Sequence, residues 1–427
     1  MSREMKDSGV EWIGEIPSHW GINMLTQLFN EVKCKNDNMQ ETNLLSLSYG
    51  KIKQRNINAT GGLLPENFSG YNIIEANDIV LRLTDLQNDR TSLRVGLSTQ
   101  RGIITSAYIT LRNVSDANPK YLYYYLHSFD IRKGFYGMGS GVRQGLTFDG
   151  IKYMKIVLPP IKEQQAIAHY LDQKCTEIDS IIQNTRTSIE EYKMYKQSVI
   201  TEVVTKGLNP NELMKDSGEA WIGEIPEHWE VCRLKLVANI VRGGSPRPAG
   251  DLRYYDGNIP FMKISDITKD DEIYVNSCVA SIKEAGLSNT RMVNSGTLLL
   301  TNSGATLGVP KITTFDTTFN DGIAAFLDVK ETINLLFMYY SLKAKTKWFL
   351  QVASMGQGQP NLNTDIIGNT TFVYPTSLNE QQTICDYLDA KCTEIDNLIT
   401  QKHQIISELE TYKKSLICEC VTGKKEV

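Results

Sequence analysis

The sequence predicts an α+β protein in which two mixed α/β globular regions are separated by a long antiparallel two-helix coiled coil, as a pseudo-two-fold internal repeat. Two duplications lead to this prediction. EQQAIAHYLDQKCTEID (residues 163–179) returns as EQQTICDYLDAKCTEID (380–396), with 13 of 17 positions identical. MKDSGVEWIGEIPSHW (5–20) returns as MKDSGEAWIGEIPEHW (214–229), with 13 of 16 identical. The order of motif, globular region and helix is therefore present twice.

Each EQQ segment opens a helix with one narrow apolar stripe. Apolar residues recur there at steps of three and four, the spacing of a seam between two helices. A continuous helix over residues 161–205 would be about 65 Å long. Because both stripes have the same spacing, each helix is the obvious partner of the other. The stripes contain Ile167, Leu171, Cys175, Ile178, Ile182, Ile189, Tyr192, Val199 and Val203 in the first helix, and Ile384, Leu388, Cys392, Ile395, Ile399, Ile406, Leu409, Leu416 and Cys420 in the second.

Start and stop signals agree with these helices. Ser377 and Glu380 form an S-x-x-E capping box before the second helix, and Pro160 holds the matching place before the first. Gly207 and then Pro210 end the first helix. In the other motif, tryptophans 12, 20, 221 and 229 are expected to pack as apolar anchors, and the histidines at 19 and 228 to pack or cap.

The two globular regions share an order of predicted elements. Strands are expected at 78–82 and 103–111 and a helix at 119–135 in the first region; strands at 260–264, 297–301 and 323–329 and a helix at 334–353 in the second; and closing strands at 153–158 and 370–374. We expect four parts: residues 1–158 (motif and first region), 159–210 (central helix), 211–374 (motif and second region) and 375–427 (C-terminal helix, pairing with 159–210).

Composition excludes several classes of protein. The 427 residues contain no apolar run long enough to cross a membrane, and the N-terminus lacks the form of a signal peptide, so we expect a cytoplasmic protein without a membrane partner. Eight cysteines without a C-x-x-C pair indicate reduced, packed side chains. The five histidines show no ligand spacing and there is no phosphate-binding G-x-x-x-x-G-K-[ST] loop, so neither a metal site nor an ATPase is predicted.

Charge is distributed unevenly along the chain. The net charge is −4, yet residues 21–158 carry 16 Lys+Arg against 11 Asp+Glu, and residues 230–373 carry 14 against 13. The acidity lies in the duplicated segments, for example at Glu177, Asp179, Glu394 and Asp396. This distribution is expected if the regions that differ face phosphate and the duplicated framework faces protein.

With GEIP-x-HW, L-P-P-I-x-E-Q-Q and the duplicated layout, the whole chain resembles the specificity (S) subunit of type I restriction-modification systems. The resemblance implies that each globular region is a target recognition domain reading one half of a bipartite site in double-stranded DNA, with the coiled coil fixing the spacer. It implies two methyltransferase subunits and restriction subunits as partners. It also implies no catalysis and no cofactor on this chain, with S-adenosylmethionine, ATP and Mg²⁺ on the partner subunits.

Candidate DNA contacts are polar residues in Gly-rich or basic loops. Arginine and lysine can bind phosphate or guanine, amides suit adenine, and glycine lets the backbone approach closely. The candidates are Lys51, Lys53, Arg55, Arg82, Arg90, Arg94, Arg101, Arg143 and Gln144 in the first region, and Arg242, Arg247, Lys263, Thr301, Ser303, Gln357, Gln359 and Asn361 in the second.

The sequence also raises two other classes of function, methyl transfer and binding of protein alone. Residues 135–139 spell F-x-G-x-G, like the cofactor loop of adenine methyltransferases, but this loop follows a predicted helix rather than a strand. The Pro-Pro pair at 159–160 is not preceded by an amide or carboxylate that could bind a target amine. Methyl transfer by this chain is therefore not predicted. A coiled-coil scaffold that binds only protein remains the alternative.

Overall fold

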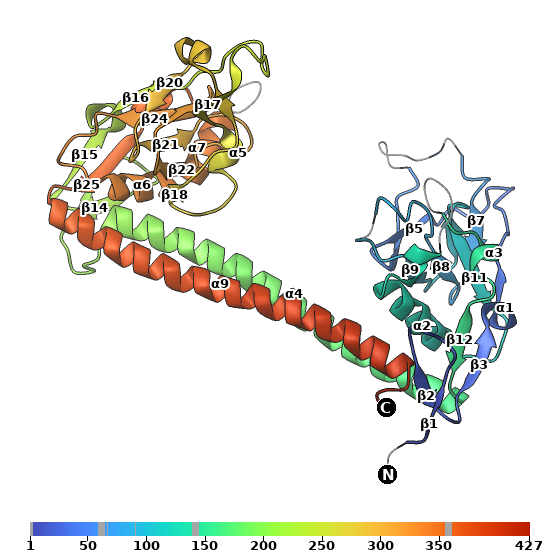
Figure 1. Cartoon of the computed structure of the whole chain (residues 1–427). Helices are drawn as coiled ribbons and strands as arrows, with labels where there is room; N and C mark the ends of the chain where they lie inside the picture. The colour runs from blue at the N-terminus through green and yellow to red at the C-terminus, as the bar shows by residue number, and fades with distance from the viewer. Residues whose placement is uncertain (1–2, 59–64, 66, 90, 139–144, 355–360) are drawn as a thin grey trace. The chain divides into compact units, whose positions relative to one another are not determined.

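The computed structural model describes residues 3–58, 65, 67–89, 91–138, 145–354 and 361–427, without the side chains of 352–354. It divides into two units (Figure 1). Unit 1 consists of Met1–Arg186 and His403–Val427, and unit 2 of Thr187–Lys402. Both ends of the chain thus belong to unit 1, and each long helix contributes to both units.

The motif of unit 1 folds as a hairpin followed by an entry strand. β1 (Met5–Asp7) pairs with β2 (Glu15–Pro17), and Gly14 between them has φ +71°, a left-handed conformation that glycine adopts without strain. β3 (Gly21–Met24) then pairs antiparallel with β12 (Lys155–Leu158). The globular region therefore begins and ends on neighbouring strands.

The core sheet of unit 1 is antiparallel, in the order β4–β11–β8–β9. A hairpin and a further strand pair lie beside it and bury Leu45, Leu47, Ile74 and Ile104 together with Val80 of the sheet. The strands are β4 (Phe29–Glu31), β5 (Leu45–Ser48), β6 (Lys51–Gln54), β7 (Asn72–Ile74), β8 (Ile79–Leu81), β9 (Val95–Leu97), β10 (Gly102–Ile104) and β11 (Ile109–Asn113). The strand predicted at 103–111 is thus two strands, because the chain turns between them, where the Tyr108 amide donates to the Thr105 carbonyl.

Helix α2 (Pro119–Ile131) lies between this sheet and the strand β12 (Figure 1). Asn118 caps it by accepting from the amides of residues 120 and 121. The helix predicted to reach residue 135 ends earlier, because Lys133 adopts φ +62° and a 3-10 turn, η1 (Gly134–Gly137), follows. Tyr121 and Tyr125 donate hydroxyl hydrogen bonds to carbonyls of β12, which fixes α2 on that strand. Unit 1 also contains the short helices α1 (Leu25–Leu28) and α3 (Phe148–Ile151).

Unit 2 repeats the motif hairpin and the pairing of entry and exit strands. β13 (Met214–Asp216) pairs with β14 (Glu224–Pro226), and the entry strand β15 (Trp229–Arg233) with the exit strand β25 (Thr371–Pro375). The core sheet has the order β16–β24–β21–β22–β18, and β19–β17–β23–β20 form a second sheet. The strands are β16 (Asn239–Arg242), β17 (Tyr255–Met262), β18 (Tyr274–Val275), β19 (Ser281–Ile282), β20 (Arg291–Val293), β21 (Leu298–Thr301), β22 (Pro310–Thr313), β23 (Thr317–Phe319) and β24 (Ile323–Leu327).

The helix predicted over 334–353 is two helices, α6 (Leu335–Ala344) and α7 (Thr346–Ser354), which meet at Lys345. Lys345 is buried, donates to the Thr371 carbonyl and lies 5.4 Å from the Trp221 ring centroid. Burial lowers the pKa of Lys345 to about 7. The remaining short helices of unit 2 are η2 (Leu234–Leu236), α5 (Ile264–Ile267), η3 (Glu284–Asn289) and α8 (Thr364–Gly368).

The predicted long helices are α4 (Ile161–Lys206) and α9 (Leu378–Val421). Side-chain pairs join them antiparallel within each unit. In unit 1, Lys413 lies 2.6 Å from Asp179 and Arg186 lies 3.1 Å from Glu410. In unit 2, Lys196 lies 2.6 Å from Asp396. All residues of both predicted stripes are buried or half-buried.

The helix ends follow the sequence signals, with one exception. Gly207 takes φ +73° directly after α4, and its amide donates to the Val203 carbonyl. At the start of α9 only half of the predicted capping box forms. The Glu380 amide donates to the Ser377 hydroxyl at 3.4 Å, but the Glu380 carboxylate binds elsewhere. The capping-box prediction is therefore wrong for that side chain.

Candidate functional site

A carboxylate clamp joins the N-terminal motif to α4 in unit 1. Glu163 accepts hydrogen bonds from the indole Nε1 of Trp20 at 2.9 Å and from Arg3 at 2.7 Å, and lies 2.6 Å from His19 Nε2. Burial acts to raise the pKa of Glu163, but the bonds from Trp20 and His19 outweigh it, so the pKa lies below its usual value. The H-W of one motif therefore recognises the glutamate of the other.

Unit 2 contains the same clamp. Glu380 accepts from Trp229 Nε1 at 2.9 Å and lies 2.9 Å from His228 Nε2. Both clamp tryptophans are fully buried, as the sequence predicted for apolar anchors. The histidines neither pack in a core nor cap a helix but pair with a carboxylate. Sequence reasoning missed this pairing, although the joint duplication of H-W and E-Q-Q was a signal for it.

The glutamine after each clamp glutamate is a buried bridge. Gln164 accepts from the Asn118 amide at 2.8 Å and donates to the Pro159 carbonyl at 2.7 Å. Gln381 repeats this with the Asn334 amide at 2.7 Å and the Pro375 carbonyl at 2.9 Å. The long helix, the exit strand and the cap of α2 or α6 are thus held together at one point, which positions the globular region of each unit.

In unit 1, the hairpin β5–β6 presents a basic face. Lys51, Lys53 and Arg55 are exposed and alternate along the strand, so they lie on one side, about 7 Å apart. The other side of the hairpin buries Leu45 and Leu47. This face, which we call the hairpin face, gathers three predicted residues in a row suited to phosphate groups.

Arg94 was predicted as a DNA contact, but its environment argues against that role. It is 0% exposed. Its guanidinium donates to the carbonyls of Arg82 at 3.0 Å and Thr84 at 2.8 Å, to further carbonyls at 85 and 89, and to the Tyr136 hydroxyl. Because these donors are used inside the protein, Arg94 shapes the loop after β8 and is not available to a ligand.

Two further predicted arginines of this region, Arg101 and Arg82, lie beside carboxylates. Arg101 is half-exposed but bonds both Glu41, at 3.0 Å, and Glu75. Arg82 lies 4.0 Å from Asp89. Hydrogen bonds from the amides of the following turn lower the pKa of Asp89, so this acid stays charged beside Arg82. These cations are therefore partly neutralised within unit 1.

In unit 2, three predicted residues gather around Asp321. Arg242 donates through Nε to the Asp321 carbonyl at 2.6 Å, and Arg247 lies 3.7 Å from its carboxylate. A pocket of about 370 Å³ is lined by Arg247, Lys263 and Asp321. Arg247 and Lys263 are exposed at its rim. We call this group the Asp321 cluster.

Three predicted residues of unit 2 lie in or beside the polar turn that begins at Thr301. Thr301 is buried, donates to the Thr306 carbonyl at 2.8 Å and accepts from the Val309 amide at 2.9 Å, so its hydroxyl is engaged within the turn. Ser303 and Asn361 form a β-bridge, with Ser303 half-buried and Asn361 exposed. Arg90, Arg143, Gln144, Gln357 and Gln359 lie outside the described residues.

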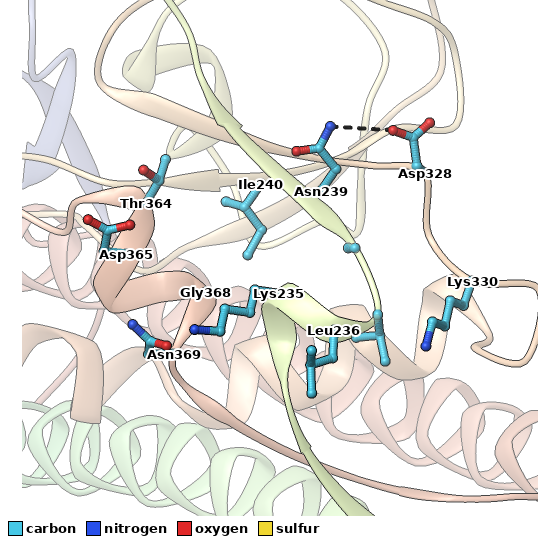
Figure 2. Close-up of a pocket in the computed structure, with 12 residues that line it drawn as sticks. Lys235, Leu236, Asn239, Ile240, Asp328, Lys330, Thr364, Asp365, Gly368 and Asn369 are labelled. Carbon is cyan, nitrogen blue, oxygen red and sulfur yellow. Dashed lines mark hydrogen bonds between the residues drawn. The ribbon is translucent and has the colours of Figure 1, made fainter.

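A further pocket of about 440 Å³ lies between η2, β16 and α8 (Figure 2). Lys235 and Lys330 line it together with Asp328 and Asp365, so its charges balance. Asn239 donates to Asp328 at 3.4 Å across one side. The pocket contains none of the predicted contact residues.

The described residues contain no group of three or more His, Cys, Asp or Glu that could hold a metal ion. Within the same residues, no helix is both long and apolar enough to span a bilayer. The eight cysteines are free thiols. The acidic residues noted on the framework are paired locally: Glu177 with Lys174 and Glu394 with Lys391, both at 2.7 Å, in addition to the pairs of Asp179 and Asp396.

Fold and site together define a duplicated α/β protein with a basic surface group on each repeat. The family model described as "Type I restriction modification DNA specificity domain" matches the chain twice, at residues 17–191 and 226–411. The chain belongs to this family, as the resemblance of its motifs indicated.

Individual relatives agree with this assignment. The chain is 24% identical to the putative type I restriction enzyme MjaX specificity subunit of Methanocaldococcus jannaschii, over 97% of this chain and 96% of that protein. It is 26% identical to the MjaVIII specificity subunit of the same organism, over 83% and 80%.

Two solved structures share the fold. One, from work on the complex assembly and conformational transition of the type I R-M system, has a TM-score of 0.72 at 16% identity, covering 96% of this chain and 99% of that one. The other is the HsdS subunit from Thermoanaerobacter tengcongensis, with a TM-score of 0.52 at 15% identity, covering 96% and 98%.

Proposed function

We propose that this chain is the DNA specificity subunit of a type I restriction-modification enzyme, and that each globular region is a target recognition domain for one half of a bipartite double-stranded site. One observation carries the proposal. The same clamp, Glu163 with Trp20 or Glu380 with Trp229, holds two regions whose surface residues differ. A repeated framework that carries two different globular regions is what the recognition of two different half-sites requires.

The helices α4 and α9 act in this proposal as an antiparallel coiled coil that fixes the spacer between half-sites. The pairs Lys413–Asp179 in unit 1 and Lys196–Asp396 in unit 2 support it, because they repeat one contact between the two helices in each unit. When two weakly binding domains are joined by a stiff connection, binding of one raises the effective concentration of the other at its half-site, and the overall affinity increases. The proposed division is residues 1–158 and 211–374 for the recognition parts, and 159–210 and 375–427 for the helices.

The partners follow from the duplication. A framework present twice offers the same docking surface twice, which suits two identical methyltransferase subunits carrying S-adenosylmethionine. Restriction subunits using ATP and Mg²⁺ would join this core in the cytoplasm. The chain itself is a non-catalytic recognition subunit, and the absence of a catalytic tetrapeptide in its sequence supports that role.

The proposed DNA contacts divide by chemistry. The hairpin face in unit 1 suits phosphate, since three cations alternate along one exposed strand. The Asp321 cluster in unit 2 combines cations at a pocket rim, and Ser303 and Asn361 add neutral donors and acceptors for base edges. The residues outside the described part that keep their predicted role are Arg90, Arg143, Gln144, Gln357 and Gln359.

The test uses the assembled complex with its methyltransferase subunits and a library of random bipartite duplexes. We expect selection of one sequence pair at a fixed spacing. The variant Lys53→Ala/Arg55→Ala should weaken binding to all sequences alike and reduce the slope of log K against log salt by about 2, because two phosphate contacts are lost. Lys33→Ala is the matched control, since Glu31 at 2.7 Å already compensates its charge. A complex that assembles but selects no sequence would favour the protein-only scaffold.

A further inference from the structure

Unit 1 contains a pocket that shares Lys51 with the hairpin face and no residue with the clamp. Its volume is about 680 Å³, within the range of small-molecule sites. It lies between the β5–β6 turn, the C-terminal end of α2, and the helices α4 and α9. We call it the α2 pocket.

The α2 pocket is strongly basic. Five cations, Lys51, Lys133, Arg186, Lys413 and Lys414, line it against two acids, Asp179 and Glu410. Both acids are already engaged, Asp179 by Lys413 at 2.6 Å and by Lys51 at 3.9 Å, and Glu410 by Arg186 at 3.1 Å. Lys133 and Lys414 form no ion pair with any described residue. The pocket therefore offers uncompensated positive charge to an anion.

A buried histidine in the wall is an independent indication of a ligand. His127 is 8% exposed, and its buried Nδ1 has no hydrogen-bond partner among the described residues. Its ring is stacked on Tyr123 with centroids 5.3 Å apart, which fixes its orientation. A buried polar group without a partner costs free energy unless something binds it.

The pocket also has an apolar part to its lining. Leu93, Ile131, Ile182 and Ile417 contribute to it, and the exposed Tyr49 is a further lining residue. A simple inorganic ion would leave this surface uncovered. The pocket suits a ligand that joins an anionic group to a flat or apolar part.

We propose that the α2 pocket binds a phosphate group, with Lys133, Lys414 and Lys51 as its cationic partners, His127 as a hydrogen-bonding partner and the apolar side taking an attached base or sugar. The phosphate could belong to a free nucleotide or to the backbone of DNA. The inference does not depend on the proposed function, because it uses only the charge and shape of unit 1.

Unit 2 provides a built-in comparison. Its equivalent pocket, of about 520 Å³, contains the repeated pair Lys196–Asp396 and has Lys343 at the position of His127, counted from the caps of α6 and α2. Four acids line that pocket, against two lysines. The repeated elements thus form a cavity in both units, but of these two cavities only the α2 pocket is basic. Its positive charge is therefore not a consequence of the repeated fold.

The test is calorimetric titration of the full chain, without partner subunits, with ATP, inorganic pyrophosphate and a short duplex. Binding of ATP that weakens about tenfold or more in Lys133→Ala/Lys414→Ala supports a nucleotide site. Binding of the duplex alone, with the same sensitivity to the variant, supports a backbone phosphate. Lys343→Ala, in the equivalent pocket of unit 2, is the matched control and should change neither titration.

The state of His127 gives a readout besides affinity. Burial lowers the pKa of His127 to about 4, so its ring is neutral at pH 7. A bound phosphate should raise that pKa, visible as a shifted titration of the His127 ring signals in NMR spectra, and His127→Phe should bind more weakly while remaining folded. Absence of binding by all three probes, or equal binding by the lysine variant, would overturn the proposal.

Discussion

Replacing Gln164 by leucine tests whether the buried amide bridge holds the globular region of unit 1 to its frame. The substitution leaves the Pro159 carbonyl and the Asn118 amide without their partner. Each unpaired buried group costs about 1–3 kcal/mol. The Asn118 amide is only partly buried and the leucine gains some apolar burial, so we expect a loss of about 2–4 kcal/mol in the free energy of unfolding of unit 1.

The assay is thermal unfolding combined with native-state hydrogen exchange, which resolves the two units. The unfolding midpoint of unit 1 should fall by roughly 5–15 °C, and the Asn118 amide should exchange faster. Gln165→Leu is the matched control, because Gln165 is the next residue on the same helix and is exposed. Equal stability of the Gln164→Leu and Gln165→Leu variants would refute the reasoning.

Two other predictions concern the seam and a buried lysine. Because Ile178 is 5% exposed, Ile178→Asp should destabilise the contact between α4 and α9 in unit 1 by about 3 kcal/mol or more. The proposed complex with two methyltransferase subunits should then be absent from native mass spectra. The control Ile181→Asp, at an exposed position, should assemble normally. Lys345 has a folded pKa of about 7 against an ordinary value of 10.5, so between these pH values the unfolded chain binds one proton more than the folded chain. The free energy of unfolding of unit 2 should therefore rise with pH in this range, by up to about 1.4 kcal/mol per pH unit. Lys345→Met should lack this slope in urea titrations from pH 7 to 9.5, and parallel pH profiles of the two proteins would contradict the assignment.

The long helices were predictable because their signal is periodic and extends over more than forty residues. Short elements were less predictable, since a single residue decides where they end. Lys133 at positive φ ends α2 before the predicted boundary, and buried Lys345 divides the second helix. Neither residue type carries a strong local preference for such a break, so tertiary contacts decided both.

The candidate site was predictable in its residue types but not in their partners. Arg94 and Arg55 look alike in sequence, yet one is enclosed by backbone carbonyls and the other lies on an exposed strand. The difference depends on the loop after β8, which folds around Arg94. For the clamp, the sequence contained both halves of each contact, and only the structure brought them together across more than 140 residues.

The pairing of β3 with β12, in the register Gly21 to Leu158, has a consequence for how such a protein can change. The main chain enters the globular region of unit 1 along β3 and leaves it along β12, and these two strands are hydrogen-bonded to each other. In unit 2, β15 and β25 form the same pair of entry and exit strands. A different globular region whose first and last strands pair in the same way can replace the present one as a whole. New specificities can therefore arise by exchange of the chain between these two strands, while the clamp residues on either side stay unchanged.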